Sequence, residues 1–248
     1  MKGEEREIVR LGKWLPDRTH FKENLHNFIY ALLIICLMMI ETLLPPFVKR
    51  GVAWYSFYIG AYLKYLLRAA FVLFIVLVLE KRPLSSLGFR NFKKNGLFFY
   101  REIFWTIILC LILLPGIRFA PSQPFYQNLS QARLLFHAVY ILLAVSLVEE
   151  MVWRGFIFSR LSLSTGKLLA LLISSIFNSL WHLPYYQKFS FTQGSSLLPS
   201  LAVTFIMALV MCFITLATER IIGRWNVYPV IALHWFGDIG FYLLNKIL

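Results

Sequence analysis

The sequence predicts an all-α protein, a polytopic bundle of about seven to eight transmembrane helices. Of the 248 residues, 59% are hydrophobic and 15% are charged, whereas about a quarter of the residues in a soluble domain are charged. The apolar residues form long blocks without a period of 2 or 3.6, so they cannot all face one aqueous core. Basic residues lie mainly between the blocks, as in membrane proteins. Soluble folds and outer-membrane barrels are therefore set aside.

A membrane-spanning helix needs roughly 20 mostly apolar residues. Ser164, Thr165 and Gly166 form the natural turn between the fourth and fifth predicted spans. No repeat or low-complexity linker appears, so we expect a single integral membrane domain over residues 1–248. The predicted spans are residues 27–48, 53–79, 97–117, 134–163, 167–186, 197–218 and 227–246.

The basic residues predict the orientation of the chain. Six of them lie in residues 1–26 and five more lie between residues 80 and 96, whereas the short segment between the first two spans has only Lys49 and Arg50. By the positive-inside rule, the N-terminus is cytoplasmic and residues 1–26 form a cytoplasmic or interfacial segment. We expect the plasma (inner) membrane, and no removable signal peptide is visible. The net charge of +13 is explained by topology, so no nucleic-acid partner is expected.

Ionisable residues inside a span are costly and by default mark a site. A first group can be explained by structural pairing or by contact with a substrate, because Lys64 and Arg68 share a helical face and Glu41 is a candidate partner for both. This group comprises Glu41, Lys64, Arg68 and His137.

A second group is denser and lies in three otherwise apolar segments, "SLVEEMVWRGF", "SSIFNSLWHLP" and "ALHWFGDIG". Glu150 and Arg154 have the i, i+4 order that favours a helical ion pair. Glu149 lies about 140° around the helix from Arg154 and is left without that partner. A buried carboxylate without a cationic partner is suited to taking a proton from water. The group comprises Glu149, Glu150, Arg154, His182, His234 and Asp238.

Helical rise predicts that these residues meet at one depth. Two antiparallel helices leaving the turn at 164–166 carry Glu149 and His182 to the same level, roughly 25 Å along each helix. Asp238 reaches roughly 21 Å from the last preceding basic residue, Arg224, and His234 shares its face at a shallower level. Either an interhelical hydrogen-bond network or a functional cavity explains such a cluster, and the number of matching groups favours the cavity.

At these residues the sequence resembles the CAAX prenyl protease and bacteriocin-processing family, also called the CPBP or ABI family of intramembrane glutamic endopeptidases. The family's E-E-x-x-x-R motif is matched by Glu149-Glu150-Met-Val-Trp-Arg154, and its H-x-x-x-N or H-x-x-x-D motif by His234-Trp-Phe-Gly-Asp238. In its F-x-x-x-H motif only His182 fits, because Phe177 is displaced by one position and Asn178 stands in its place. The match covers roughly residues 134–246, the expected catalytic core helices.

The resemblance implies a role for each residue. Glu149 and His182 would hold and activate the attacking water, and His234 and Asp238 would stabilise the oxyanion. Glu150 and Arg154 would position the helix. An aspartate donates a hydrogen bond only when it is protonated, so Asp238 would act either as a neutral donor or by orienting His234. The displaced Phe177 affects the packing around His182.

We therefore predict an intramembrane endopeptidase that hydrolyses a peptide bond with a glutamate-activated water. Its partners would be the lipid bilayer and a membrane-anchored protein or peptide, such as a CAAX-type substrate, a C-terminal sorting signal or a bacteriocin precursor. The alternatives are a non-enzymatic immunity or scaffold protein, a transporter that uses Glu149 for proton coupling, and a zinc peptidase.

No cofactor is expected. Two histidines and a glutamate are zinc-ligand types, but the chain lacks an H-E-x-x-H motif. The three cysteines lie inside apolar blocks without metal-type spacing, so we interpret them as packing residues. They are Cys36, Cys110 and Cys212.

Overall fold

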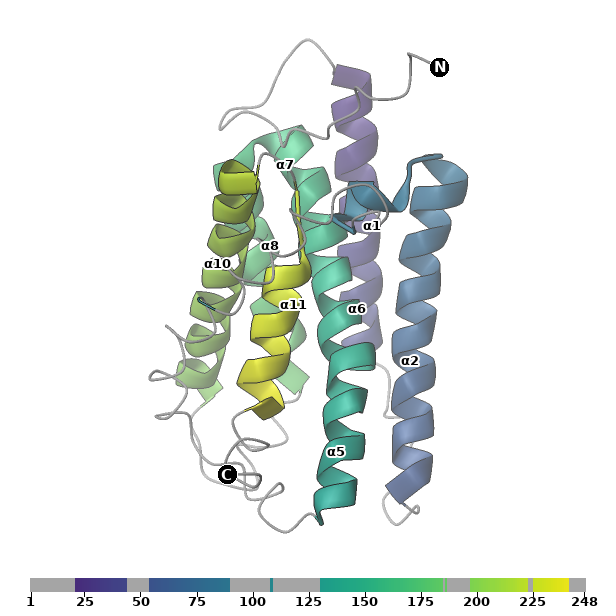
Figure 1. Ribbon diagram of the computed structural model, residues 1–248. Coiled ribbons are helices and arrows are strands. Elements are labelled where there is room, and N and C mark those ends of the chain that lie inside the picture. The colour runs from purple at the N-terminus through teal and green to yellow at the C-terminus, as the bar shows by residue number, and fades with distance from the viewer. Residues whose placement is uncertain are drawn as a thin grey trace.

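The structure is a computed structural model that describes residues 21–43, 54–89, 108, 130–184, 186, 197–222 and 225–240. All regular elements in these residues are helices, which stand side by side as an upright bundle (Figure 1). The all-α prediction is thus confirmed. The predicted span 97–117, with Cys110, lies outside the described residues except for residue 108, as do residues 1–20 of the predicted N-terminal segment.

The helix boundaries lie within six residues of the ends of the predicted spans. The first helix is α1 (Phe21–Leu43), which begins six residues before the predicted start at 27. The second is α2 (Trp54–Phe74), which continues as the π-helix η2 (Ile75–Leu79) and is followed by the 3-10 turn η3 (Leu84–Leu87). The later helices are α8 (Lys167–Trp181), α10 (Leu197–Ile222), α11 (Tyr228–Trp235) and the π-helix η7 (Phe236–Gly240).

One long helix forms the centre of the bundle and alternates between α-helical and π-helical turns. Its π-helical segment 151–158 is buried on all sides, because α1, α2, α8 and α10 pack around it. The helix ends at Thr165, and Gly166 turns the chain with a φ of 84°, which confirms the predicted turn. Its segments are α5 (Gln131–Tyr140), η5 (Ile141–Ser146), α6 (Leu147–Glu150), η6 (Met151–Phe158) and α7 (Ser159–Thr165).

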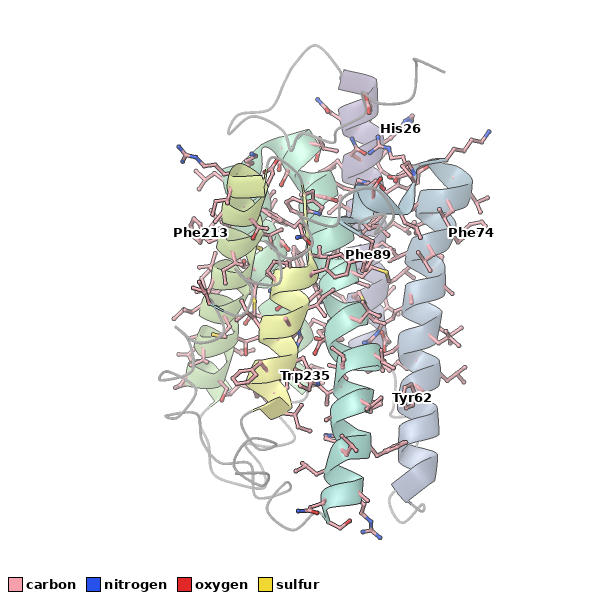
Figure 2. The ribbon with its side chains drawn as sticks, in the orientation of Figure 1. His26, Tyr62, Phe74, Phe89, Phe213 and Trp235 are labelled. Carbon is pink, nitrogen blue, oxygen red and sulfur yellow. The ribbon has the colours of Figure 1, made fainter. Side chains whose placement is uncertain are left out.

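Within the described residues, four helices are long and apolar enough to span a membrane: Glu23–Glu41, Tyr62–Leu79, Gln131–Thr165 and Leu197–Ile221. The apolar helix α8 is shorter, and the count of seven to eight spans stays a prediction. Large apolar side chains cover the outside of the bundle, where lipid tails solvate them without cost. Figure 2 shows Phe213 and Phe74 on opposite outer sides of the bundle, where they are 53% and 49% exposed.

The turn after α2 is fastened to the central helix. Arg160 is fully buried and binds both carboxylate oxygens of Glu80, and its Nη1 donates to the Ser86 carbonyl oxygen at 3.3 Å. Nearby, the backbone of Leu87 lies so close to Gly155 that a Cβ atom there would stand 2.6 Å from the Leu87 oxygen. Only glycine therefore permits this approach, which fixes η3 against the buried segment η6.

The first ionisable group forms the predicted pairing between α1 and α2. Arg68 Nε and Nη2 each donate to a Glu41 oxygen at 2.6 Å, and Lys64 Nζ lies 2.5 Å from the same carboxylate. His137 lies on α5, where its ring stacks on Tyr140 with centroids 5.8 Å apart.

Candidate active site

The two adjacent glutamates lie on the one α-helical turn between the π-helical segments η5 and η6. Glu149 and Glu150 are only 4% and 1% exposed. Because π-helical turns have i to i+5 hydrogen bonds, the sequence spacing alone does not decide which of the two glutamates faces Arg154. The observed contacts of each carboxylate decide it.

Glu150 has a cationic partner, as the sequence predicts. Its Oε1 accepts a hydrogen bond from Arg154 Nη1 at 3.0 Å, and both side chains are buried. Arg154 Nη2 also donates to the Ala208 carbonyl oxygen of α10 at 3.5 Å. The same Glu150 oxygen lies 2.8 Å from His234 Nδ1. Glu150 thus links the central helix to α11 and, through Arg154, to α10.

Glu149 has different neighbours. Its Oε1 accepts a hydrogen bond of 2.8 Å from the hydroxyl group of Tyr65 on α2. Its Oε2 lies 3.9 Å from His234 Nε2, beyond hydrogen-bond distance. The expectation that Arg154 pairs with Glu150 and not with Glu149 agrees with these contacts. The phenol of Tyr65 was not anticipated.

His234 lies between the glutamates and Asp238. Its Nδ1 contacts Glu150, and its Nε2 lies 3.4 Å from Asp238 Oδ2, one turn further along the chain. The adjacent Trp235 donates from Nε1 to the Ala138 carbonyl oxygen at 2.9 Å, and Figure 2 shows this residue at the lower end of α11. Both ring nitrogens of His234 therefore face carboxylates, and Trp235 anchors α11 against α5.

His182 follows the last residue of α8 and caps this helix. Its Nδ1 lies 2.9 Å from the backbone oxygen of Asn178. A carbonyl oxygen only accepts, so Nδ1 donates the hydrogen, and in the neutral ring Nε2 is left as an acceptor. Because this contact uses the backbone of Asn178, it does not depend on the side chain at that position. The displaced Phe177 packs against the core instead.

The structure brings Glu149, His234 and Asp238 together directly, and His182 indirectly. None of the hydrogen bonds or ion pairs within the described residues joins His182 to Glu149. The connection runs through aromatic rings: the His182 ring meets Trp181 edge-on at 4.9 Å, and Arg68 lies over Trp181 at 4.7 Å and over Tyr65 at 4.6 Å.

Two residues of this arrangement, Tyr65 and Trp181, were missed by sequence reasoning. Both lie in segments rich in aromatic residues, where no spacing distinguishes one ring from the next. The only available signal was proximity in the chain, since Tyr65 follows Lys64 and Trp181 precedes His182. Across the described residues, no three His, Cys, Asp or Glu side chains are placed to hold a metal ion together.

Comparison with known protein families gives a match to part of the chain. No curated protein and no solved structure matches the chain. Residues 131–240, which contain all six predicted site residues, match the family model of the Rce1-like type II CAAX prenyl endopeptidases. Over this segment, the match confirms the resemblance of the chain to the CAAX prenyl protease family.

Proposed function

We propose that the protein is an integral membrane endopeptidase that hydrolyses a peptide bond with a water molecule activated by Glu149. The observation that carries this proposal is the division of partners between two adjacent buried glutamates. Glu150 binds a guanidinium group, whereas Glu149 binds the Tyr65 phenol and lies 3.9 Å from His234 Nε2. Arg154 therefore pairs with Glu150 and not with Glu149, which leaves Glu149 Oε2 beside His234 as the candidate general base.

In the first step, Glu149 and His182 act on the attacking water. Glu149 Oε2 takes one proton from the water, and His182 Nε2 accepts a hydrogen bond from the other hydrogen. The resulting hydroxide oxygen forms a bond to the carbonyl carbon of the scissile peptide, and the π electrons of the carbonyl move onto its oxygen.

In the second step, the oxyanion collapses. His234 Nε2, when the ring is doubly protonated, donates a hydrogen bond to the negative oxygen, as preorganised donors do in other acyl-transfer sites. Glu149 returns its proton to the nitrogen of the leaving amine, so the carbon–nitrogen bond breaks and a carboxylic acid and an amine are released. Glu150, bound to both Arg154 and His234, holds the histidine in place.

The family match supports a proposal for the substrate class. We propose a membrane-anchored protein or peptide with a CAAX-type C-terminus, with a C-terminal sorting signal or a bacteriocin precursor as the other candidates. The bilayer would hold the anchor while the peptide enters between the helices.

The test uses the purified full-length protein in liposomes with a quenched fluorogenic peptide ending in a farnesylated CAAX sequence. Removal of a general base typically lowers turnover by about 10²–10⁴-fold, and we expect this loss in Glu149→Gln. Glu219→Gln is the matched control, because it removes a carboxylate that pairs with Lys167 at 3.1 Å. Equal turnover of the wild type and Glu149→Gln would overturn the mechanism.

A wild-type protein that leaves the farnesylated peptide intact would overturn the CAAX substrate. Proteomics of membranes from a knockout strain would then identify sorting-signal or bacteriocin precursors that accumulate uncleaved. If no precursor accumulates and alanine variants of the six site residues have the wild-type phenotype, the protein is a non-enzymatic membrane protein.

A further inference from the structure

We propose that Tyr65, on α2, is a positioning residue that holds Glu149 in the orientation needed to activate water. This inference rests on the proposed function, because it assigns to Tyr65 a role that acts through Glu149. It extends the site beyond the family-matched segment 131–240, to a helix that contains none of the residues of the family motifs.

The contact itself is direct. The Tyr65 hydroxyl group donates to Glu149 Oε1 at 2.8 Å. A phenol is a neutral donor, so it fixes the carboxylate without neutralising its charge, unlike a guanidinium group. With Oε1 engaged, Oε2 is the oxygen directed toward His234 Nε2, 3.9 Å away. In this proposal, Oε1 holds the carboxylate in its orientation, and Oε2 takes the proton from water.

The ring of Tyr65 is itself held on two sides. The Arg68 guanidinium group lies over it at 4.6 Å, and the ring of Tyr140 on the central helix meets it edge-on at 6.5 Å. Arg68 is fixed in turn by its two hydrogen bonds of 2.6 Å to Glu41. The ion pair between α1 and α2 therefore has a use at the site, since it restrains the ring that presents the hydroxyl group.

The Arg68 guanidinium group also connects the surroundings of Glu149 with those of His182, the two residues proposed to activate water. It also lies over the ring of Trp181, 4.7 Å from the centroid, and the Trp181 ring meets that of the next residue, His182, at 4.9 Å. Glu149 thus contacts α2 directly through Tyr65, and His182 is linked to the same helix through its neighbour Trp181. A shift of α2 would therefore change the surroundings of both residues.

The primary test is Tyr65→Phe, which removes one oxygen atom and keeps the ring against Arg68. The matched control is Tyr62→Phe on the same helix, because the Tyr62 ring packs edge-on against Tyr140 at 4.8 Å, and none of the hydrogen bonds among the described residues involves its hydroxyl group. Hydrogen bonds to charged groups contribute about 1.5–3 kcal/mol, which corresponds to about 10- to 150-fold in rate.

We expect kcat for the farnesylated peptide to fall about 10-fold or more in Tyr65→Phe, with KM within about twofold of the wild-type value and turnover in Tyr62→Phe unchanged. A purely structural hydroxyl group would lower the unfolding temperature and leave kcat of the folded fraction unchanged, which would overturn the proposal. If Glu149→Gln is inactive while Tyr65→Phe has full activity, the positioning role fails alone. If Glu149→Gln is fully active, the proposed function fails first.

A second measurement does not depend on turnover or on the folding of Tyr65→Phe. The residue 3-fluorotyrosine, placed at position 65 or at position 62, retains the hydroxyl group and reports its environment by ¹⁹F resonance. We expect Glu149→Gln to shift the resonance at position 65 and to leave that at position 62 in place. Equal responses at the two positions, or none at 65, would overturn the contact.

Discussion

Gly155 provides a sharp test of how the buried centre of the bundle is packed. A Cβ atom at this position would lie 2.6 Å from the carbonyl oxygen of Leu87, a backbone atom that cannot rotate away. Gly155→Ala therefore forces η3 away from the central helix. Overpacking of this kind costs about 1–3 kcal/mol.

Gly237→Ala is the matched control. Gly237 also lies in a π-helical segment, η7, but nothing stands within 4 Å of a Cβ atom there. Replacing glycine by alanine in a helix contributes about 0.5–1 kcal/mol of stability through backbone entropy, and this contribution is common to both variants. Their difference in the free energy of unfolding therefore isolates the packing cost, which we expect to be about 1–3 kcal/mol.

The assay is unfolding of the full-length protein by SDS in mixed micelles, followed by far-UV circular dichroism. We expect Gly155→Ala to unfold at lower SDS fractions than the wild type, and Gly237→Ala at equal or higher fractions. If Gly155→Ala is as stable as Gly237→Ala, then η3 does not approach the central helix as closely as the structure has it. The explanation that the Leu87 backbone requires a glycine at position 155 would then be wrong.

Two further predictions concern the glutamates and metal. Glu150→Gln leaves the buried guanidinium group of Arg154 without its counter-charge, so we expect a loss of about 3–5 kcal/mol in SDS titration. Glu149→Gln removes no guanidinium partner and keeps an oxygen that can accept from Tyr65, so its loss should be smaller. Equal losses would contradict the division of partners. Because we expect no metal in the reaction, EDTA should leave turnover unchanged, and elemental analysis should find less than one zinc per protein. A loss of activity in EDTA that added zinc restores would show a zinc peptidase.

Much of the fold was predictable because the membrane imposes simple rules on the sequence. The helices 54–79, 131–165 and 197–222 differ by no more than four residues at either end from the predicted spans. The π-helical turns were not predictable, since they leave no change in apolar composition. Nor was the close approach at Gly155, because a glycine in a helical pattern does not by itself specify its neighbour.

The candidate site was predictable only where its partners share a helix. The pairing of Glu150 with Arg154 followed from i, i+4 spacing and is present. The contacts of Glu150 with His234 and of Glu149 with Tyr65 each join residues that are 84 positions apart. Helical rise predicts a common depth for the site residues, but it does not predict the rotation of each helix about its axis, which decides which side chains meet.

Asp238 poses the remaining chemical question, because it can act on the oxyanion or on His234. Its Oδ2 lies 3.4 Å from His234 Nε2, and its side chain is 41% exposed, a geometry that favours orienting the histidine. Asp238→Asn keeps an oxygen acceptor toward Nε2, so we expect turnover within about threefold of the wild type, at the scale of one weak, partly exposed hydrogen bond. Asp238→Leu keeps none and should lose about tenfold, measured with the same farnesylated peptide. A large gain in Asp238→Asn would instead show that an amide donor at this position binds the oxyanion, and unchanged turnover in Asp238→Leu would remove the residue from the site.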